Sequence, residues 1–210
     1  MKAVNRFNSR IRWRARIVVL AVVAVGVAGH PHAAPGGDPR LALVRLLDLV
    51  EAERAALNRT ALPIYSRGGK FAGLKDCVAS KATTDRLEAT LVAVIGRSVA
   101  ADDAAQPVLR FLSSPPGKKF LVGVERRNRG SAAELTGPNL PGRRPMNFAG
   151  VVLFSNELTE QEARTIDSFL RSDEGKPLRS ILSDTAGFAQ LTRSIAQMNT
   201  FAAECGIELK

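Results

Sequence analysis

The chain has 210 residues, of which 45% are hydrophobic and 24% are charged, a composition ordinary for one globular domain or two small ones. This composition excludes a disordered chain, a collagen and a polytopic membrane protein. The net charge of +10 would suggest a nucleic-acid-binding protein, but the charges are distributed unevenly along the sequence.

The first 34 residues have the pattern of a secretory signal peptide. Residues 1–16 contain six cations and no acidic residue, and residues 17–28 are an uncharged, mostly apolar run. That run is shorter than the roughly 20 residues that a membrane-spanning helix needs. Small residues suited to cleavage follow. We therefore expect a signal peptide over 1–34 and a periplasmic or secreted domain over 35–210; an uncleaved segment would instead anchor the chain in the inner membrane.

Cleavage would change which functions the chain can support. Subtracting the six cations from 30 leaves 24 against 20 acidic residues, a net charge of +4, so we expect no nucleic-acid partner. Trp13, His30 and His32 would also be lost. Imidazole is the usual base of serine and cysteine catalysts and a common zinc ligand. The sequence therefore assigns no catalytic, cofactor-binding or metal-binding residue, predicts no cofactor, and favours a non-enzymatic protein.

Two cysteines, Cys77 and Cys205, lie 128 positions apart, which is neither a CxxC motif nor a metal-ligand spacing. In an oxidising compartment we expect them to form one disulfide. The alternative is a pair of buried thiols that do not meet, because a sequence does not give the distance between them.

Helical periodicity dominates residues 35–210. Asp38 and Pro39 predict the N-cap and first residue of a helix that runs to about Asn58. Residues 61–73, rich in Gly and Pro, predict a connection. A long helix is expected over 74–99, with a possible interruption at Thr83 and Thr84.

Two segments resemble each other when the chain is compared with itself at an offset of 58 residues. Residues 111–121 (FLSSPPGKKFL) and 169–179 (FLRSDEGKPLR) share Phe, Leu, Ser, Gly and Lys, and each follows an acidic helix start. We expect two related helix hairpins, about 101–130 and 157–190, in which the shared Ser caps the second helix and the shared Gly permits a close backbone approach. The predicted fold is an all-α helical bundle of about six helices that contains these two hairpins.

The remaining segments are less regular. A loop rich in Pro and Gly, residues 136–147, is predicted to join the hairpins. The apolar run 146–154 fits either a helix or a strand. A final helical stretch is expected from Asp173 to about Cys205, with possible breaks at Pro177 and Gly187. One stripe of this helix is expected to face the core: Ile195, Met198, Phe201, Ala202 and Cys205.

The pattern at 111–120, Phe-Leu-x-Ser-Pro-x-Gly-Lys-Lys-Phe after an acidic helix start, resembles the bacterial exported family named domain of unknown function 2059. Residues 157–178 follow the pattern more loosely, with Asp173 in place of Pro. The resemblance covers about half of residues 35–210. It implies an exported, wholly helical domain and no catalytic residues.

Two groups of charged side chains are candidates for function. The basic cluster could contact anionic lipid head groups or envelope polymers, or could simply be a solvated face: Lys118, Lys119, Arg126, Arg127 and Arg129. The acidic group could hydrolyse envelope polymers, or could interact with helix dipoles: Asp102, Asp103, Glu157, Glu160 and Glu162.

The sequence thus favours an exported, non-enzymatic binding or envelope-associated interaction module, whose partner is an unidentified protein or envelope component. Membrane contact is expected only through an uncleaved signal segment. Two alternatives stay open. A carboxylate-based hydrolase of cell-envelope polymers would show paired acids in a cleft, and a carrier of a small apolar ligand would show an internal apolar cavity.

Overall fold

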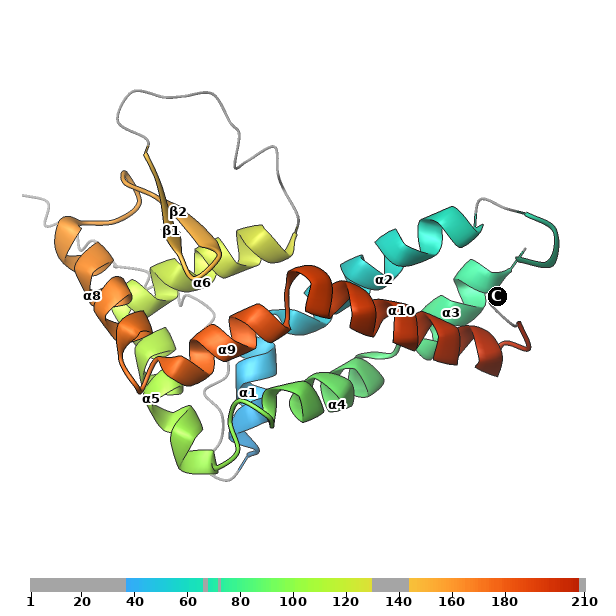
Figure 1. The fold of residues 1–210 in the computed structure, drawn as a ribbon, viewed down its shortest axis with the longest axis horizontal. Coiled ribbons are helices and arrows are strands. Elements are labelled where there is room, and N and C mark those ends of the chain that lie inside the picture. The colour runs from blue at the N-terminus through green and yellow to red at the C-terminus, as the bar shows by residue number, and fades with distance from the viewer. Residues whose placement is uncertain (1–36, 66–67, 72, 130–143, 208–210) are drawn as a thin grey trace, which may run out of the picture. The chain divides into compact units, whose positions relative to one another are not determined.

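The computed structural model describes residues 37–65, 68–71, 73–129 and 144–207, all within the unit that spans 33–210. The predicted signal peptide, residues 1–34, lies outside the described residues. The elements found are α1 (Pro39–Leu46), α2 (Leu49–Tyr65), a 3-10 turn (Gly69–Phe71), α3 (Leu74–Lys81), α4 (Thr84–Ile95), α5 (Asp102–Ser113), α6 (Pro115–Asn128), β1 (Pro145–Phe148), β2 (Val151–Phe154), α8 (Glu160–Arg171), α9 (Lys176–Asp184) and α10 (Gly187–Glu204) (Figure 1). The predicted all-α bundle is confirmed, although the described residues hold nine α-helices and not about six.

The predicted first helix is two helices. It begins as expected, with the Asp38 carboxylate accepting a hydrogen bond from the Arg40 backbone N–H at 2.8 Å. Asp48 then adopts a left-handed backbone conformation, with φ 51°, and separates α1 from α2. Helix α2 also continues into the predicted connection at 61–73, as far as Tyr65, and contains Pro63.

The predicted long helix over 74–99 is interrupted where the sequence suggested. Helix α3 ends at Lys81, and the Thr83 hydroxyl caps α4 by accepting a hydrogen bond from the Arg86 backbone N–H. Helix α4 ends at Ile95, one turn earlier than expected.

The two related helix hairpins are α5–α6 and α8–α9. In each, the shared serine accepts a hydrogen bond from the shared glycine, Ser114 from Gly117 N–H at 3.2 Å and Ser172 from Gly175 N–H at 3.1 Å. A Cβ on either glycine would overlap the carbonyl oxygen of the shared phenylalanine in the preceding helix. The predicted cap at Ser114 and the predicted close backbone approach in both hairpins are confirmed. The predicted cap of the second helix by Ser172 is wrong: Ser172 ends α8, and α9 begins later than the expected Asp173, at Lys176, with Gly175 as its N-cap and no side-chain cap.

The hairpins pack on each other reciprocally. Helix α5 packs on α9, and α8 packs on α6, so that the first helix of each hairpin contacts the second helix of the other (Figure 1). The equivalent rings of Phe111 and Phe169 stack at this contact, with centroids 4.1 Å apart and planes inclined by 9°.

Residues 146–154, for which the sequence left helix and strand open, belong to an antiparallel hairpin of β1 and β2 that pairs Pro145 with Phe154 and Phe148 with Val151. Strand β1 begins at Pro145, so the predicted loop of 136–147 ends earlier than expected; residues 136–143 of that loop lie outside the described residues. Proline is tolerated at the first residue of a strand. Strand β2 packs against α6 where Gly123 lacks a side chain.

The C-terminal stretch breaks at only one of its two predicted points. Pro177 lies in the first turn of α9, where a proline is tolerated, and does not interrupt the helix. Gly187, with φ 55°, begins α10 after the end of α9 at Asp184.

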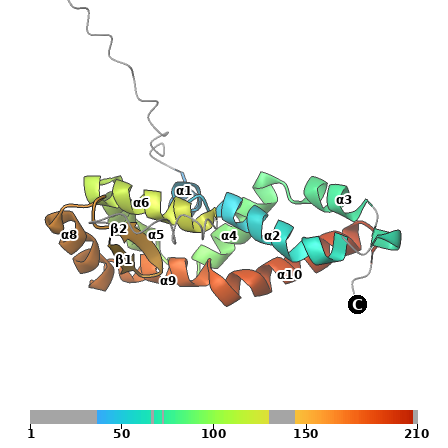
Figure 2. The same ribbon diagram turned by 90° about the horizontal axis from the view of Figure 1, so that it is seen from above.

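The described residues form two hydrophobic cores. The first lies among α1, the end of α4, both helix hairpins and the two strands. The second lies among the later part of α2, α3, the start of α4 and the later part of α10, which pack together (Figure 2). Along α2, Leu49 belongs to the first core and Leu57 to the second. Glu53, between them, is only 1% exposed and is paired with Arg193 of α10 at 2.7 Å.

Candidate functional site

Helix α10 carries almost no charge on its exposed surface. Among its 18 residues the charged ones are Arg193 and Glu204. Arg193 points inward to Glu53, whose other carboxylate oxygen accepts a hydrogen bond from the Ser194 hydroxyl at 3.2 Å. Glu204 pairs with Arg86 of α4 at 2.6 Å. The exposed remainder of the helix is therefore uncharged.

Three large apolar side chains stand on the exposed part of this helix: Phe188, Leu191 and Ile195 are 83%, 47% and 45% exposed. Their spacing of i, i+3 and i+7 places them along one side of α10. We name these three residues the α10 stripe. An aromatic ring exposed to this extent beside two aliphatic side chains is typical of an interaction surface.

The prediction that Ile195 faces the core is wrong. Met198, Phe201 and Ala202 of the same predicted set are buried, and Cys205 is bonded to Cys77. Seven residues turn a helix through nearly two full turns, so Ile195 lies on almost the same side of α10 as the buried Ala202. Ile195 differs in its position along the axis: the second core contains α10 residues only from Met198 onward.

A groove of about 330 Å³ adjoins the α10 stripe. It is lined by residues of two helices, α2 and α10: Ala56, Arg59, Thr60, Gly187, Gln190 and Leu191. We name it the α2/α10 groove. Arg59 is exposed and has no ion pair among the described residues. The groove thus combines an apolar wall with one available cation, and its lining within the described part of the chain contains no acidic residue.

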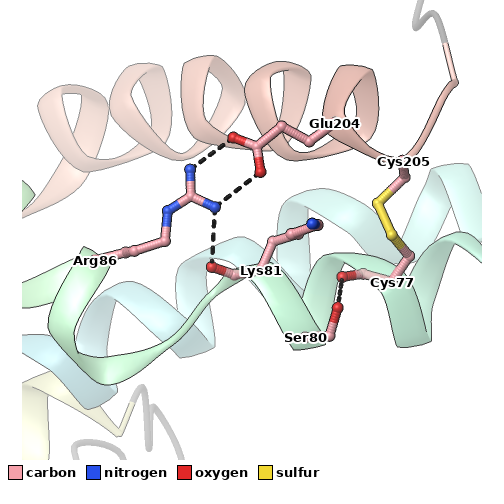
Figure 3. Close-up of a disulfide and its surroundings, with 6 residues drawn as sticks. All are labelled: Cys77, Ser80, Lys81, Arg86, Glu204 and Cys205. Carbon is pink, nitrogen blue, oxygen red and sulfur yellow. Dashed lines mark hydrogen bonds and ion pairs between the residues drawn. A yellow bond between two sulfur atoms is a disulfide. The ribbon is translucent and has the colours of Figure 1, made fainter.

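The opposite end of α10 is held in place covalently and by charge. The predicted disulfide between Cys77 and Cys205 is confirmed, with Cα atoms 6.2 Å apart, and it joins α3 to the end of α10 (Figure 3). Beside it, Arg86 donates hydrogen bonds to the Glu204 carboxylate and to the Lys81 carbonyl oxygen. The guanidinium of Arg86 lowers the pKa of Glu204 below the ordinary 4.5. The α10 stripe is therefore on a helix that is fixed at its far end.

The predicted basic cluster lies on and just after α6 but does not form an open cationic surface. Lys119 Nζ is 2.7 Å from a carboxylate oxygen of Glu162, and Arg126 is 2.6 Å from Glu157. These pairs join α6 to residues 31 and 43 positions later in the chain.

The other three cations of that cluster differ in their surroundings. Arg129 pairs with Glu125 on its own helix turn. Arg127 is half-buried and donates to the Leu182 carbonyl oxygen at 3.4 Å, and burial lowers the pKa of its guanidinium. Lys118 alone of the five is exposed with no ion pair among the described residues.

The acidic candidates lie at or near helix starts. Glu162 forms a capping box with Thr159, and Glu157 accepts a hydrogen bond from the Phe154 backbone N–H at 2.9 Å. The remaining acidic candidates are in the first turns of α5 and α8: Asp102, Asp103 and Glu160. None of the five lines the α2/α10 groove.

Two further properties of the described part of the chain bear on function. No helix there combines the length and the apolar character needed to cross a membrane. In the same residues, no cluster of three or more His, Cys, Asp or Glu side chains is arranged to hold a metal ion.

No protein-family model, curated protein or solved structure was found to match this chain. The resemblance of residues 111–121 to domain of unknown function 2059 therefore stays a prediction.

Sequence reasoning did not single out Phe188, Leu191 or Arg59. The available signal was the charge content of residues 187–204: a helix with so few charges and apolar residues on every side has more apolar surface than one core contact covers. Only the packing of α2 and α3 shows which side stays exposed.

Proposed function

We propose that this chain is an exported, non-enzymatic interaction module of the cell envelope, which binds an amphipathic helix of a protein partner along the α10 stripe and in the α2/α10 groove. The observation that carries the proposal is the exposure of Phe188, Leu191 and Ile195 on one side of α10.

The stripe supplies the apolar part of such an interface. Covering one aromatic and two half-exposed aliphatic side chains stabilises a complex by roughly 4 kcal/mol in total, at the usual value for apolar area. A helix that presents apolar residues at i, i+3 and i+7 fits a linear stripe of this kind. Because the exposed part of α10 is uncharged, no charge on it has to be desolvated when the partner binds.

The groove supplies the selectivity. Arg59 lines it as a cation without an ion pair among the described residues, and none of the acidic residues that the structure describes lines the groove. A carboxylate on the partner helix would complement this cation, whereas a lysine there would be repelled. The occupant is thus an amphipathic helix with an acidic residue next to its apolar face.

Export is supported by two independent features. The sequence of residues 1–34 is basic and then apolar, as secretory signals are. The Cys77–Cys205 bond is of a kind that persists in oxidising compartments. The resemblance to an exported family agrees with both.

Intact mass tests the export part of the proposal. The protein recovered from the cell envelope fraction, without reductant, should have the mass of a chain that starts near residue 35, less two hydrogens for the disulfide. A mass that retains residues 1–34 would contradict cleavage, and two free thiols would contradict an oxidising location.

A charge-swap experiment tests the binding part. The probe is a fluorescein-labelled amphipathic helical peptide with Leu at i, i+3 and i+7 and a Glu beside that face, and its match carries Lys at the same position. Fluorescence anisotropy should show that the Glu peptide binds about tenfold more tightly than the Lys peptide. Arg59→Glu should reverse this order. Phe188→Asp should abolish binding of both, and because this side chain is mostly exposed, the variant should still fold.

The control is Ala189→Asp, which places the same carboxylate on an exposed position of α10 that is not in the stripe. It should bind both peptides as the unchanged protein does. Equal binding of the two peptides, or binding that survives Phe188→Asp, would refute the proposal. Two other results would also refute it. One is a dimer, seen by sedimentation velocity, that Phe188→Asp abolishes, because a second copy of the chain would then cover the stripe. The other is binding to anionic lipid vesicles that Phe188→Asp abolishes, because a membrane would then cover it.

A further inference from the structure

A second depression, of about 410 Å³, lies between the turn of the β-hairpin and the helices α8 and α9. We name it the hairpin pocket. Its lining combines two largely buried apolar side chains with charged and polar groups around them: Phe148 and Leu170, then Asn147, Ala149, Asp167, Arg171 and Arg179. None of these residues lines the α2/α10 groove.

The charges of the hairpin pocket do not balance. Asp167 is neutralised by Arg171 at 2.9 Å on the next turn of α8. Arg179 of α9 is half-buried, and it has neither an ion pair nor a side-chain hydrogen bond among the described residues. A partly buried cation is usually compensated by an acid. The pocket therefore keeps one net positive charge, at Arg179.

Comparison of the two helix hairpins shows that these charged residues are not needed for the hairpin fold. At an offset of 58 residues, the positions of Asp167 and Arg179 correspond to Leu109 and Leu121 in the first hairpin. Both leucines pack against the first core. The hairpins share the residues that close them and the pocket residue Leu170, and they differ at the charged positions that line this pocket.

The turn that forms one wall of the pocket has an unfavourable backbone. Ala149 has φ 52° and Gly150 φ 82°, the pattern of a type I′ turn, in which Asn or Gly normally occupies the first position. The Asn147 side chain accepts a hydrogen bond from the Gly150 N–H at 2.8 Å and holds this turn. Strained residues of this kind cluster at binding sites.

The geometry points to a binding site for a monoanionic ligand in which a carboxylate is attached to a small apolar group. The carboxylate would form two parallel hydrogen bonds with the Arg179 guanidinium, whose planar shape matches it. The apolar group would lie on Phe148 and Leu170. The C-terminus of a peptide and a free acylated amino acid share this chemistry.

Titration with N-acetyl-leucine tests the site, using the full-length chain labelled with ¹⁵N. Amide signals of residues 147–150 and of α9 should shift, and Arg179→Gln should weaken the affinity at least about tenfold. N-acetyl-leucinamide, which has an amide in place of the carboxylate, should bind weakly to the unchanged protein. Its affinity should equal that of N-acetyl-leucine for the Arg179→Gln variant. Asp167→Asn should tighten binding severalfold, because it removes the acid that competes for the pocket's cations. This gain cannot arise from unfolding.

Arg110→Gln is the matched control, since Arg110 is an exposed arginine of α5 that does not line the pocket. It should leave the affinity unchanged. A peptide ending in Leu with a free carboxylate distinguishes the sources: tighter binding than N-acetyl-leucine identifies a chain terminus as the ligand, and equal binding identifies the free acid. Equal binding of the acid and its amide would refute the inference. So would equal binding of inorganic phosphate, or an affinity that Arg179→Gln does not change.

Discussion

At the scale of single residues, each helix hairpin depends on the absence of one Cβ. Gly117 and Gly175 lie where the carbonyl oxygen of the preceding helix, from Phe111 or Phe169, approaches most closely. An equivalent serine bridges each turn, accepting a hydrogen bond from the glycine N–H and donating one to the phenylalanine carbonyl oxygen.

Gly117→Ala should lower the free energy of unfolding by about 3 kcal/mol, because a methyl group forces two backbones apart within a packed core. Gly175→Ala should cost a similar amount. Urea unfolding followed by circular dichroism measures both. Gly96→Ala is the control: its φ is −55°, and a Cβ there would meet nothing closer than a carbonyl oxygen at 3.3 Å. A loss no larger than that of the control would show that the hairpins can open at little cost.

Asp48 separates α1 from α2 in a conformation that asparagine adopts more readily. Burial, and then Glu51 and Glu125, raise the pKa of its carboxyl group above the ordinary 3.8. The folded state therefore binds the proton more tightly than the unfolded chain does, and stability falls as the pH rises from about 3.8 through the raised pKa.

Asp48→Asn removes this cost and should stabilise the protein at pH 7 by roughly 0.5 kcal/mol, a small value because solvent screens a partly exposed group. The gain should be smaller at pH 3, where the aspartate is protonated. Urea unfolding at both pH values measures the difference. A destabilised variant at pH 7 would mean that the negative charge favours the start of α2 more than burial opposes it.

At the scale of elements, α8 begins with a complete capping box. The Thr159 hydroxyl accepts a hydrogen bond from the Glu162 N–H, and the Glu162 carboxylate accepts one from the Thr159 N–H at 2.8 Å. The same carboxylate binds Lys119 of α6, and both interactions lower its pKa. One glutamate thus starts a helix and joins it to the other hairpin.

Thr159→Ala should reduce the free energy of unfolding by about 1 kcal/mol, the usual cost of losing an N-cap hydroxyl. Thr200→Ala is the matched control, because that threonine is exposed within α10 and bonds only to the carbonyl oxygen one turn earlier. It should change stability by less than about 0.5 kcal/mol. Thermal unfolding compares the two variants. Equal losses would show that the capping box is replaced by another start of the helix.

At the scale of the whole molecule, two hydrophobic cores meet along α2, and the buried Glu53–Arg193 pair lies between them. The disulfide closes the second core only, because Cys77 lies in α3 and Cys205 directly follows the end of α10. The two cores therefore depend on the disulfide to different degrees.

Reduction of the disulfide should lower the free energy of unfolding by about 4 kcal/mol, since it releases a loop of more than 100 residues. Hydrogen exchange should locate the loss: amides of α3 and of the later turns of α10 should lose more protection than amides of the two helix hairpins. The Cys77→Ser, Cys205→Ser double variant should not respond to reductant. Uniform loss of protection would mean that both cores unfold as one unit.

The sequence by itself determined the features that a few neighbouring residues decide. The caps at Asp38 and Ser114 were predicted, because a cap is a hydrogen bond within three residues of the chain. The helix hairpins were predicted because the residues that form each turn are neighbours in the chain and are shared at an offset of 58. The disulfide was predicted from the number of cysteines and the expected compartment.

Tertiary structure decided the rest, because those features depend on contacts between residues distant in the chain. Lys119 and Arg126 seemed available as a basic cluster until acids 43 and 31 positions away were found to pair with them. Ile195 is predicted to face the core, because periodicity gives the side of a helix that faces its neighbours but not how far along the helix those neighbours extend. The α2/α10 groove and the hairpin pocket each join segments that only folding brings together, so neither could be predicted from the sequence.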